Sequence, residues 1–313
     1  MSRIYYNRHI DTDLLEWKNE EHHKSLLIRG ARQVGKSSAI RHLGESFKYF
    51  LEVNLERDRK VQDLFGDNID VKKICTSLSA IYGVPIIPGQ TLLFIDEIQE
   101  SKRAISALRF FYEDYPELHV IAAGSLLEFA LRDLSSFGVG RIRSLFMYPF
   151  SFDEFLDANN MQMLREYKNE VADIDNPLPP VMHDQLVEQL RSYFLVGGMP
   201  EAVQLWVTQK DYLKCAQVHR DILETYQDDF SKYGSRISPI LLTNALKSIA
   251  QQAGSKVVYS RVEGSSNSAS VKEALSLLTL AGLTIPVIHT AANGVPLGAD
   301  INPKYQKFLF TDV

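Results

Sequence analysis

The sequence has 313 residues, of which 45% are hydrophobic and 23% charged, and its formal net charge is −5 at pH 7. This composition excludes a disordered, collagen-like or fibrous chain, and the length favours two or three domains. The uncharged stretch 274–288 is too short and too interrupted to span a bilayer, and the first residues, MSRIYYNRHIDTD, lack the apolar segment of a signal peptide. The cysteines, Cys75 and Cys215, cannot form a disulfide framework, so we expect a cytoplasmic protein without membrane contact.

The charge is distributed unevenly along the chain. Residues 1–150 carry 20 Lys/Arg and 20 Asp/Glu, residues 151–235 carry 7 and 15, and residues 236–313 carry 7 and 4. A neutral, an acidic and a mildly basic region therefore follow one another, which predicts three domains with these boundaries.

The first region predicts a parallel α/β domain. Short apolar runs at 25–28, 50–53, 92–95 and 120–122 are typical of buried parallel strands, and a fifth strand is expected at 144–147. Helical patterns at 37–44 and 104–115 lie between them, which gives the strand–helix alternation of an α/β fold.

The middle region is predicted to be a helical lid, residues 151–235. Ser151 and Glu154 have the spacing of a capping box, so a helix should begin there. After Gly234 the order is helix (239–252), short extended piece (257–259), helix (270–281) and extended segments around Gly294. This order is typical of a winged helix-turn-helix, with 270–281 in the place of the recognition helix.

A phosphate-binding motif follows the first predicted strand. Gly30-Ala31-Arg32-Gln33-Val34-Gly35-Lys36-Ser37 fits the Walker A pattern G-x-x-x-x-G-K-[ST], and Ser38 follows it. Glycines allow a tight backbone turn that aims N–H groups at phosphate oxygens, and a helix N-terminus adds its positive dipole end. Lys36 would bind the β- and γ-phosphates of ATP, and Ser37 would hold Mg²⁺. The alternative is a glycine-rich turn without a ligand.

A second acidic motif ends the third strand. Leu92-Leu-Phe-Ile-Asp96-Glu97 is a Walker B pattern, in which Asp96 would hold Mg²⁺ and Glu97 would orient and polarise the attacking water. Ser125 follows the next strand, which in an AAA-type sheet lies between the two Walker strands, so Ser125 is a candidate γ-phosphate sensor. A plain strand-end turn is the alternative for Ser125.

The sequence resembles the prokaryotic AAA-type ATPases that are similar to STAND signalling NTPases, in the AAA+ superfamily. The resemblance rests, in chain order, on the segments YYNR, GARQVGKS, LLFIDEIQE, AAGS, GRIRSLFMYPFSFDEFL and YFLVGGMPEAV, which together cover nearly the whole chain.

The resemblance implies roles for three further residues. Arg141 would contact nucleotide phosphates, either in its own chain or as a finger from a neighbour, and closed monomers among STAND-like relatives favour the first option. A surface salt bridge is the alternative. Pro200 would pack near the nucleotide base, whereas by itself it indicates only a loop between helices. Arg8 resembles the arginine that precedes the P-loop in relatives and would contact the nucleotide.

Two departures from the family pattern matter. Relatives usually continue past the strand that ends in Phe310-Thr-Asp-Val313 into a domain resembling PD-(D/E)XK nucleases, and these residues are not in the sequence. The nuclease activity of the family is therefore not carried over to this sequence, and a shortened chain and a natural short form both stay open. Ser37 and Ser38 stand where relatives commonly have threonines, which keeps the hydroxyl for Mg²⁺.

Together these patterns predict a P-loop ATPase that binds ATP and ADP. The second hypothesis is a nucleotide-gated module that contacts DNA or a partner protein and turns over ATP slowly or not at all. A small-molecule kinase fits less well, because the predicted lid is acidic and Glu97 directly follows Asp96. Any DNA contact should be weak and electrostatic, through Lys256, Arg261, Lys272, Lys304 and Lys307. The alternative is a winged helix that packs against the ATPase core or a partner protein. Whether the chain acts as a monomer or a homo-oligomer stays open.

Overall fold

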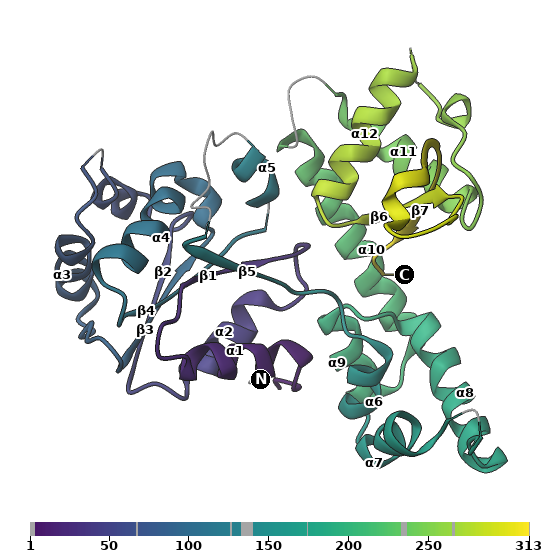
Figure 1. Ribbon diagram of the computed structural model, residues 1–313, viewed down its shortest axis with the longest axis horizontal. Helices are drawn as coiled ribbons and strands as arrows, with labels where there is room; N and C mark the ends of the chain where they lie inside the picture. Colours follow the sequence, from purple (N-terminus) through teal and green to yellow (C-terminus); the bar gives the residue numbers. More distant parts are fainter. Residues whose placement is uncertain are drawn as a thin grey trace. The chain divides into compact units, whose positions relative to one another are not determined.

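The computed structural model describes residues 4–66, 68–125, 127–132, 140–173, 175–232, 237–264 and 267–312 (Figure 1). The chain forms two compact units, Met1–Lys210 and Asp211–Val313. The predicted three-part division at residues 150 and 235 stays a prediction. Among the described residues, no helix combines the length and the apolar character needed to cross a bilayer.

The first unit contains a five-stranded parallel sheet with the strand order β2-β3-β4-β1-β5. This confirms the predicted α/β fold and places β4 between β3 and β1, as an AAA-type sheet requires. The fifth strand begins and ends earlier than predicted, since it pairs with all of β1. The strands are β1 (Ser25–Arg29), β2 (Tyr49–Asn54), β3 (Thr91–Asp96), β4 (His119–Ala123) and β5 (Ile142–Phe146).

Helices cover both faces of this sheet (Figure 1). Helices α3 and α4 pack on one face against strand residues such as Leu93 and Val120, and α1 and α2 lie on the other. Every residue of β3 and β4 is buried, which explains their nearly continuous apolar sequence. The helices are α1 (His9–Asn19), α2 (Lys36–Gly44), α3 (Val71–Tyr82), α4 (Lys102–Asp114) and α5 (Leu127–Arg132), with short 3₁₀ turns at η1 (Arg59–Leu64) and η2 (Ile98–Glu100).

A small helical group completes the first unit. Ser151 and Glu154 form the predicted capping box at the start of α6, whose buried Phe155 and Leu156 face its neighbours. Helix α8 ends at Gly197, and α9 begins at Pro200. The elements are α6 (Phe152–Ala158), α7 (Gln162–Glu166), the π-helical turn η3 (Tyr167–Val171), α8 (Pro180–Val196) and α9 (Pro200–Gln209).

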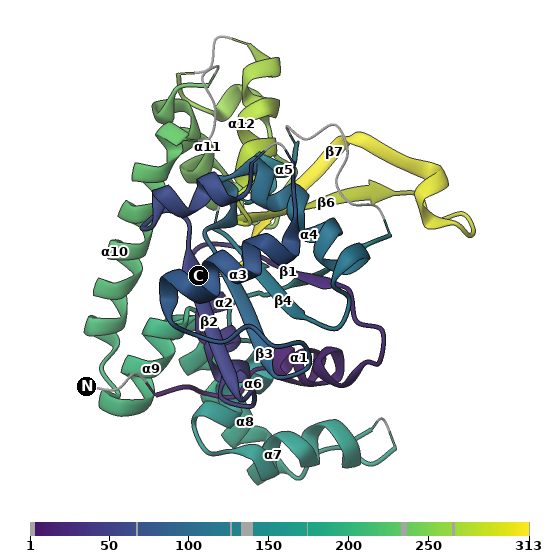
Figure 2. The same cartoon turned by 90° about the vertical axis from the view of Figure 1, so that its left-hand side faces the viewer.

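The described part of the second unit contains the helices α10, α11 and α12 and an antiparallel hairpin, which Figure 2 shows. Val271, Leu275 and Leu278 of α12 are buried and pack toward α11, and β7 pairs with β6. The expected extended piece at 257–259 is shorter, because a 3₁₀ turn begins at Tyr259. The elements are α10 (Tyr212–Asp229), η4 (Phe230–Lys232), α11 (Pro239–Gln251), η5 (Tyr259–Arg261), α12 (Ser268–Leu280), β6 (Thr284–Thr290), η6 (Leu297–Asp300) and β7 (Ile301–Phe310).

Candidate nucleotide site

The glycine-rich loop (residues 30–37) joins the end of β1 to the start of α2 at the carboxyl edge of the sheet. Gly30 and Gly35 have φ angles of 135° and 101°, in the region that favours glycine. A Cβ on Gly30 would lie 2.1 Å from the backbone oxygen of Met147, so only glycine fits there. The first amides of α2 have no partner within the helix and add a positive dipole end, so this turn can bind an anion.

Each predicted loop residue has a defined place. Gln33 is exposed and also has a positive φ, 66°. Ala31 and Val34 are buried beneath the loop, whereas Arg32 and Ser38 are half-buried. Backbone groups and not these side chains therefore form most of the cradle.

Lys36 is folded across the glycine-rich loop. Its ammonium donates hydrogen bonds to the carbonyl oxygens of Gly30, at 2.9 Å, and Ala31, at 2.7 Å. Burial lowers the pKa of Lys36 to about 8, and the carboxylates of Glu97 and Asp96 oppose that shift. The Lys36 ammonium is thus held inside the loop by two neutral carbonyl oxygens, and phosphate oxygens can replace these as acceptors.

Asp96 lies at the end of β3 beside the first turn of α2. Ser37 Oγ donates to both carboxylate oxygens of Asp96 at 3.3 Å, and the Glu97 amide donates at 3.0 Å. Burial and the neighbouring Glu97 carboxylate raise the pKa of Asp96 to about 6. Asn54, which the sequence analysis did not single out, places its amide nitrogen 3.5 Å from Asp96.

The Ser37–Asp96 pair fits Mg²⁺. Both side chains supply oxygen, and a buried carboxylate with a raised pKa gains from a nearby cation. The described residues contain no cluster of three or more His, Cys, Asp or Glu side chains that could hold a metal ion by themselves. Mg²⁺ ordinarily takes one or two protein ligands together with substrate phosphates and water, so this small donor set is sufficient.

Glu97 directly follows Asp96 and has a left-handed backbone, with φ of 49°. Its Oε2 atom accepts a hydrogen bond from Gln99 Nε2 at 2.6 Å and another from Ser125 Oγ at 3.3 Å. The structure therefore brings the predicted base and the predicted sensor together. Gln99 was missed by the sequence analysis, because nothing in a one-turn segment predicts which way its side chain points.

Arg8 is buried between three segments of the first unit. Its guanidinium donates to Glu154 at 3.0 Å, to the Val34 carbonyl at 3.2 Å and to the Tyr148 carbonyl at 2.7 Å, and it lies 3.9 Å from the centre of the Phe150 ring. Arg8 thus contacts the glycine-rich loop through a backbone carbonyl. A direct contact with a nucleotide stays a prediction.

The segment around Pro200 also reaches the glycine-rich loop. The Phe150 amide donates to Gly198 O at 2.7 Å, and a Cβ on Gly198 would lie 2.3 Å from Phe150 O. A Cβ on Gly35 would lie 3.5 Å from Pro200 Cγ, so the proline is next to the loop. Its predicted contact with the nucleotide base stays a prediction.

Arg141 is located at the other end of the sheet. It immediately precedes β5, whose first residue, Ile142, pairs with Ser25 at the start of β1. The glycine-rich loop begins after Arg29, so the length of β1 separates them, about 15 Å at the usual rise of a strand. Arg141 forms an ion pair with Glu113. The interpretation that Arg141 contacts the nucleotide of its own chain therefore needs correction, because it starts a parallel strand and the loop follows the end of one.

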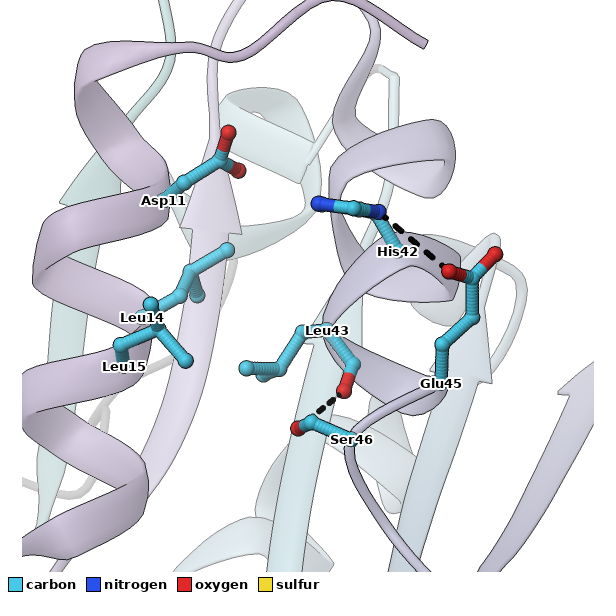
Figure 3. A pocket seen from close by; sticks show the side chains of 7 residues that line it. All are labelled: Asp11, Leu14, Leu15, His42, Leu43, Glu45 and Ser46. Carbon is cyan, nitrogen blue, oxygen red and sulfur yellow. Dashed lines mark hydrogen bonds and ion pairs between the residues drawn. The ribbon is translucent and has the colours of Figure 1, made fainter.

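A separate surface hollow of about 290 Å³ lies between α1 and α2 (Figure 3). Its floor is apolar, and its rim carries an ion pair between His42 and Glu45. None of the predicted site residues lines it. The lining residues are Asp11, Leu14, Leu15, His42, Leu43, Glu45 and Ser46.

Two protein families match different parts of the chain. Residues 22–156 match an AAA domain, and residues 187–313 match a domain of unknown function (DUF8612). A protein of Methanocaldococcus jannaschii described as uncharacterized is 23% identical over an alignment of 239 residues, which covers 71% of this chain and 50% of the relative. The chain therefore spans about half the length of that relative.

Three solved structures resemble this chain at low sequence identity and low TM-score. The Aeropyrum pernix ORC1 protein in complex with DNA is 12% identical with a TM-score of 0.36, over 99% of this chain and 90% of that one. Drosophila ORC bound to DNA is 14% identical with a TM-score of 0.38, over 99% and 85%. C. elegans PCH-2 is 11% identical with a TM-score of 0.36, over 72% and 70%.

Proposed function

From the premise that residues 22–156 belong to the AAA-type P-loop ATPase family, we propose that the protein binds ATP with Mg²⁺ and hydrolyses it. The observation that carries the proposal is the meeting of Lys36, Ser37, Asp96 and Glu97 at one edge of the sheet, with Ser37 and Asp96 3.3 Å apart. A cation, a metal-ligand pair and a carboxylate are the groups that phosphoryl transfer to water needs.

Binding would begin at the glycine-rich loop. Lys36 exchanges the carbonyls of Gly30 and Ala31 for β- and γ-phosphate oxygens, and the loop amides supply further donors. Ser37 and Asp96 would hold Mg²⁺, which when bound neutralises part of the phosphate charge.

Hydrolysis would need a base near the γ-phosphate. Glu97 accepts a proton from water as the water oxygen forms a bond to the γ-phosphorus, and the bond to the bridging oxygen breaks, with ADP leaving with that electron pair. Ser125 Oγ lies 3.3 Å from Glu97 Oε2, so the proposed sensor would be next to the proposed base.

Two substitutions test binding and chemistry separately. Lys36→Ala should weaken ATP binding at least about tenfold, because it removes the charged donor to the phosphates. Titration calorimetry measures this, with the exposed Lys60→Ala as the matched control. Unchanged affinity for Lys36→Ala would contradict the binding site.

Glu97→Gln should retain ATP binding and lower single-turnover hydrolysis about 100-fold or more, since general-base catalysis typically contributes that much. Glu100→Gln, an exposed change in the same turn, is the control. A wild-type rate in Glu97→Gln would show that another group is the base.

The second unit offers a second candidate function, a nucleotide-gated contact with DNA. Lys256, Arg261, Lys272 and Lys304 are exposed there, and α11, α12 and the hairpin have the order of a winged helix. We propose a weak electrostatic contact whose affinity falls steeply with salt. A filter-binding titration of the whole chain at two salt concentrations tests it, and sequence-selective binding that resists salt would contradict it. No binding at low salt would favour a protein-packing role.

A further inference from the structure

Glu97 is held by a side chain that the proposed reaction does not yet use. Gln99 donates from Nε2 to Glu97 Oε2 at 2.6 Å, the shortest contact of the Glu97 carboxylate among the described residues. The orientation of the Gln99 amide is fixed by this contact, because its carbonyl oxygen would be repelled by a carboxylate. The two oxygens of the Glu97 carboxylate therefore have different surroundings.

The unequal oxygens suit a base. Oε2 accepts from both Gln99 and Ser125, whereas within the described part of the chain no donor binds Oε1 of Glu97. A carboxylate with one oxygen anchored and the other available can accept a proton from water in a fixed direction. Fixed direction matters, since a misplacement of about 1 Å can lower a rate about 100-fold.

The contact between Gln99 and Glu97 comes with unfavourable features of the surrounding structure. Glu97 has a positive φ of 49°, which non-glycine residues rarely adopt. Gly124, at the end of β4, lies so close that a Cβ there would be 2.0 Å from Gln99 Oε1. Among the described residues no group donates to that buried oxygen. Disfavoured features of this kind cluster at functional sites, and a buried unpaired acceptor requires an explanation.

We propose that Gln99 is a positioning residue, which fixes the Glu97 carboxylate so that Oε1 faces the attacking water. The proposal rests on the proposed function, because it assigns Gln99 a role through Glu97. Gly124 serves this arrangement by leaving room for the Gln99 amide against β4.

The test compares Gln99→Leu with wild type in the whole chain. Leucine keeps the approximate size and removes both the donor and the unpaired acceptor, so the midpoint of urea unfolding should stay the same or rise. Single-turnover ATP hydrolysis should fall about 10- to 100-fold, while the dissociation constant for ATP changes less than about twofold, because Gln99 acts on the Glu97 carboxylate and not on the phosphate cradle. Gln99→Met serves as a second variant of similar volume.

Gln62→Leu is the matched control. Gln62 also donates its amide to a protein oxygen, Leu55 O at 2.8 Å, and this acceptor is not one of the site residues. It should lower stability and leave the single-turnover rate unchanged. A merely structural role for Gln99 predicts the same result for both variants, and that result would overturn the proposal.

A double variant separates the proposal from its premise. In a Glu97→Gln background, Gln99→Leu should cause no further loss of rate, because its effect passes through the carboxylate. The side-chain amide resonances of Gln99, identified by their disappearance in Gln99→Leu, should also shift in Glu97→Gln without any nucleotide. A slow Glu97→Gln with a fast Gln99→Leu overturns only the role of Gln99. A fast Glu97→Gln overturns Glu97 as the base and the role of Gln99 with it, whereas a wild-type chain that does not hydrolyse ATP overturns the proposed function.

Discussion

The buried pair of Arg8 and Glu154 allows a quantitative test of what holds the glycine-rich loop in place. Their side chains are 4% and 6% exposed, and Arg8 Nε lies 3.0 Å from Glu154 Oε1. Glu154 also accepts hydrogen bonds from the amides of His9, at 2.6 Å, and Ser151, at 2.8 Å. One carboxylate therefore joins the starts of α1 and α6, and one guanidinium joins that carboxylate to the loop.

The expected cost of breaking the pair follows from its burial. Although burial by itself raises the pKa of Glu154, the Arg8 guanidinium and the two amides outweigh burial and hold the pKa below its ordinary value. Glu154 is thus charged near neutral pH, and Arg8→Met leaves it buried without a counter-charge. Removing one partner of such a pair typically costs about 3–5 kcal/mol of unfolding free energy.

This cost is measured by urea unfolding of three variants: Arg8→Met, Glu154→Gln and the double variant. The double variant should be more stable than the sum of the single changes predicts, by about 1–3 kcal/mol. The matched control is the Arg41–Glu52 pair, which has a contact of 2.7 Å but an arginine side chain that is 51% exposed. Its disruption should cost about 0–1 kcal/mol.

Additive effects of Arg8→Met and Glu154→Gln, within about 0.5 kcal/mol, would refute the reasoning. ATP affinity gives a second readout. Because Arg8 also binds the Val34 carbonyl, it fixes the plane of the Val34–Gly35 peptide, and in a trans peptide the Gly35 N–H then points away from Arg8. Arg8→Met should therefore weaken ATP binding under conditions where the variant is fully folded.

Two further predictions concern stability. Burial, and then the nearby His23, lowers the pKa of His119 to about 4, so the unfolded chain takes up this proton near pH 6.5 and the folded chain does not. The neutral His119 side chain therefore contributes fully to the free energy of unfolding above pH 6.5, and this contribution, up to about 3 kcal/mol, is lost as the pH falls toward 4. His119→Phe should make the free energy of urea unfolding less dependent on pH in this range, and an unchanged dependence would contradict the prediction. Gly198→Ala should cost about 1–3 kcal/mol, since its Cβ would lie 2.3 Å from Phe150 O, whereas Gly294→Ala, which meets nothing within 4 Å, should be near neutral. Equal thermal unfolding of these two glycine variants would contradict the close packing at Gly198.

The sheet and the glycine-rich loop were predictable because their signals are local. A strand buried on both faces must be apolar throughout. Residue 30 must be glycine, because a Cβ there would lie 2.1 Å from the backbone oxygen of Met147. The family pattern then supplied the place of β4 between β3 and β1. Lys36 and the loop residues that it contacts, five and six positions away, were found in this way as parts of one motif.

The contacts that the sequence did not predict depend on side-chain direction or long separation. Arg8 and Glu154 are 146 positions apart, and the capping box explains Glu154 without requiring a charged partner. Gln99 is only two positions from Glu97, yet its role depends on a rotamer and on the approach of Gly124 from another strand. Neither kind of information is contained in spacing along the chain.

Arg141 shows how strand direction decides between two roles that the sequence left open. In a parallel sheet all carboxyl ends share one edge, and the glycine-rich loop, Asp96 and Ser125 lie there because each follows a strand. Arg141 precedes β5 and is exposed at the opposite edge, with a side chain 51% accessible. A contact between Arg141 and a nucleotide therefore requires a second copy of the chain, and we propose that role in place of the one within a single chain.

A mixing experiment tests Arg141 as a finger in trans. Arg141→Ala and Glu97→Gln should each turn over ATP slowly, since arginine fingers contribute about 10³–10⁵ in rate. In an equal mixture about one quarter of the interfaces would pair an intact Glu97 with an intact Arg141, if copies meet head to tail at random. The mixture should then recover up to about a quarter of the wild-type rate. Arg143→Ala, two residues along the same strand, is the control and should keep the wild-type rate. If Arg141→Ala is slow and the mixture shows no recovery at concentrations where wild type is active, Arg141 does not act across an interface.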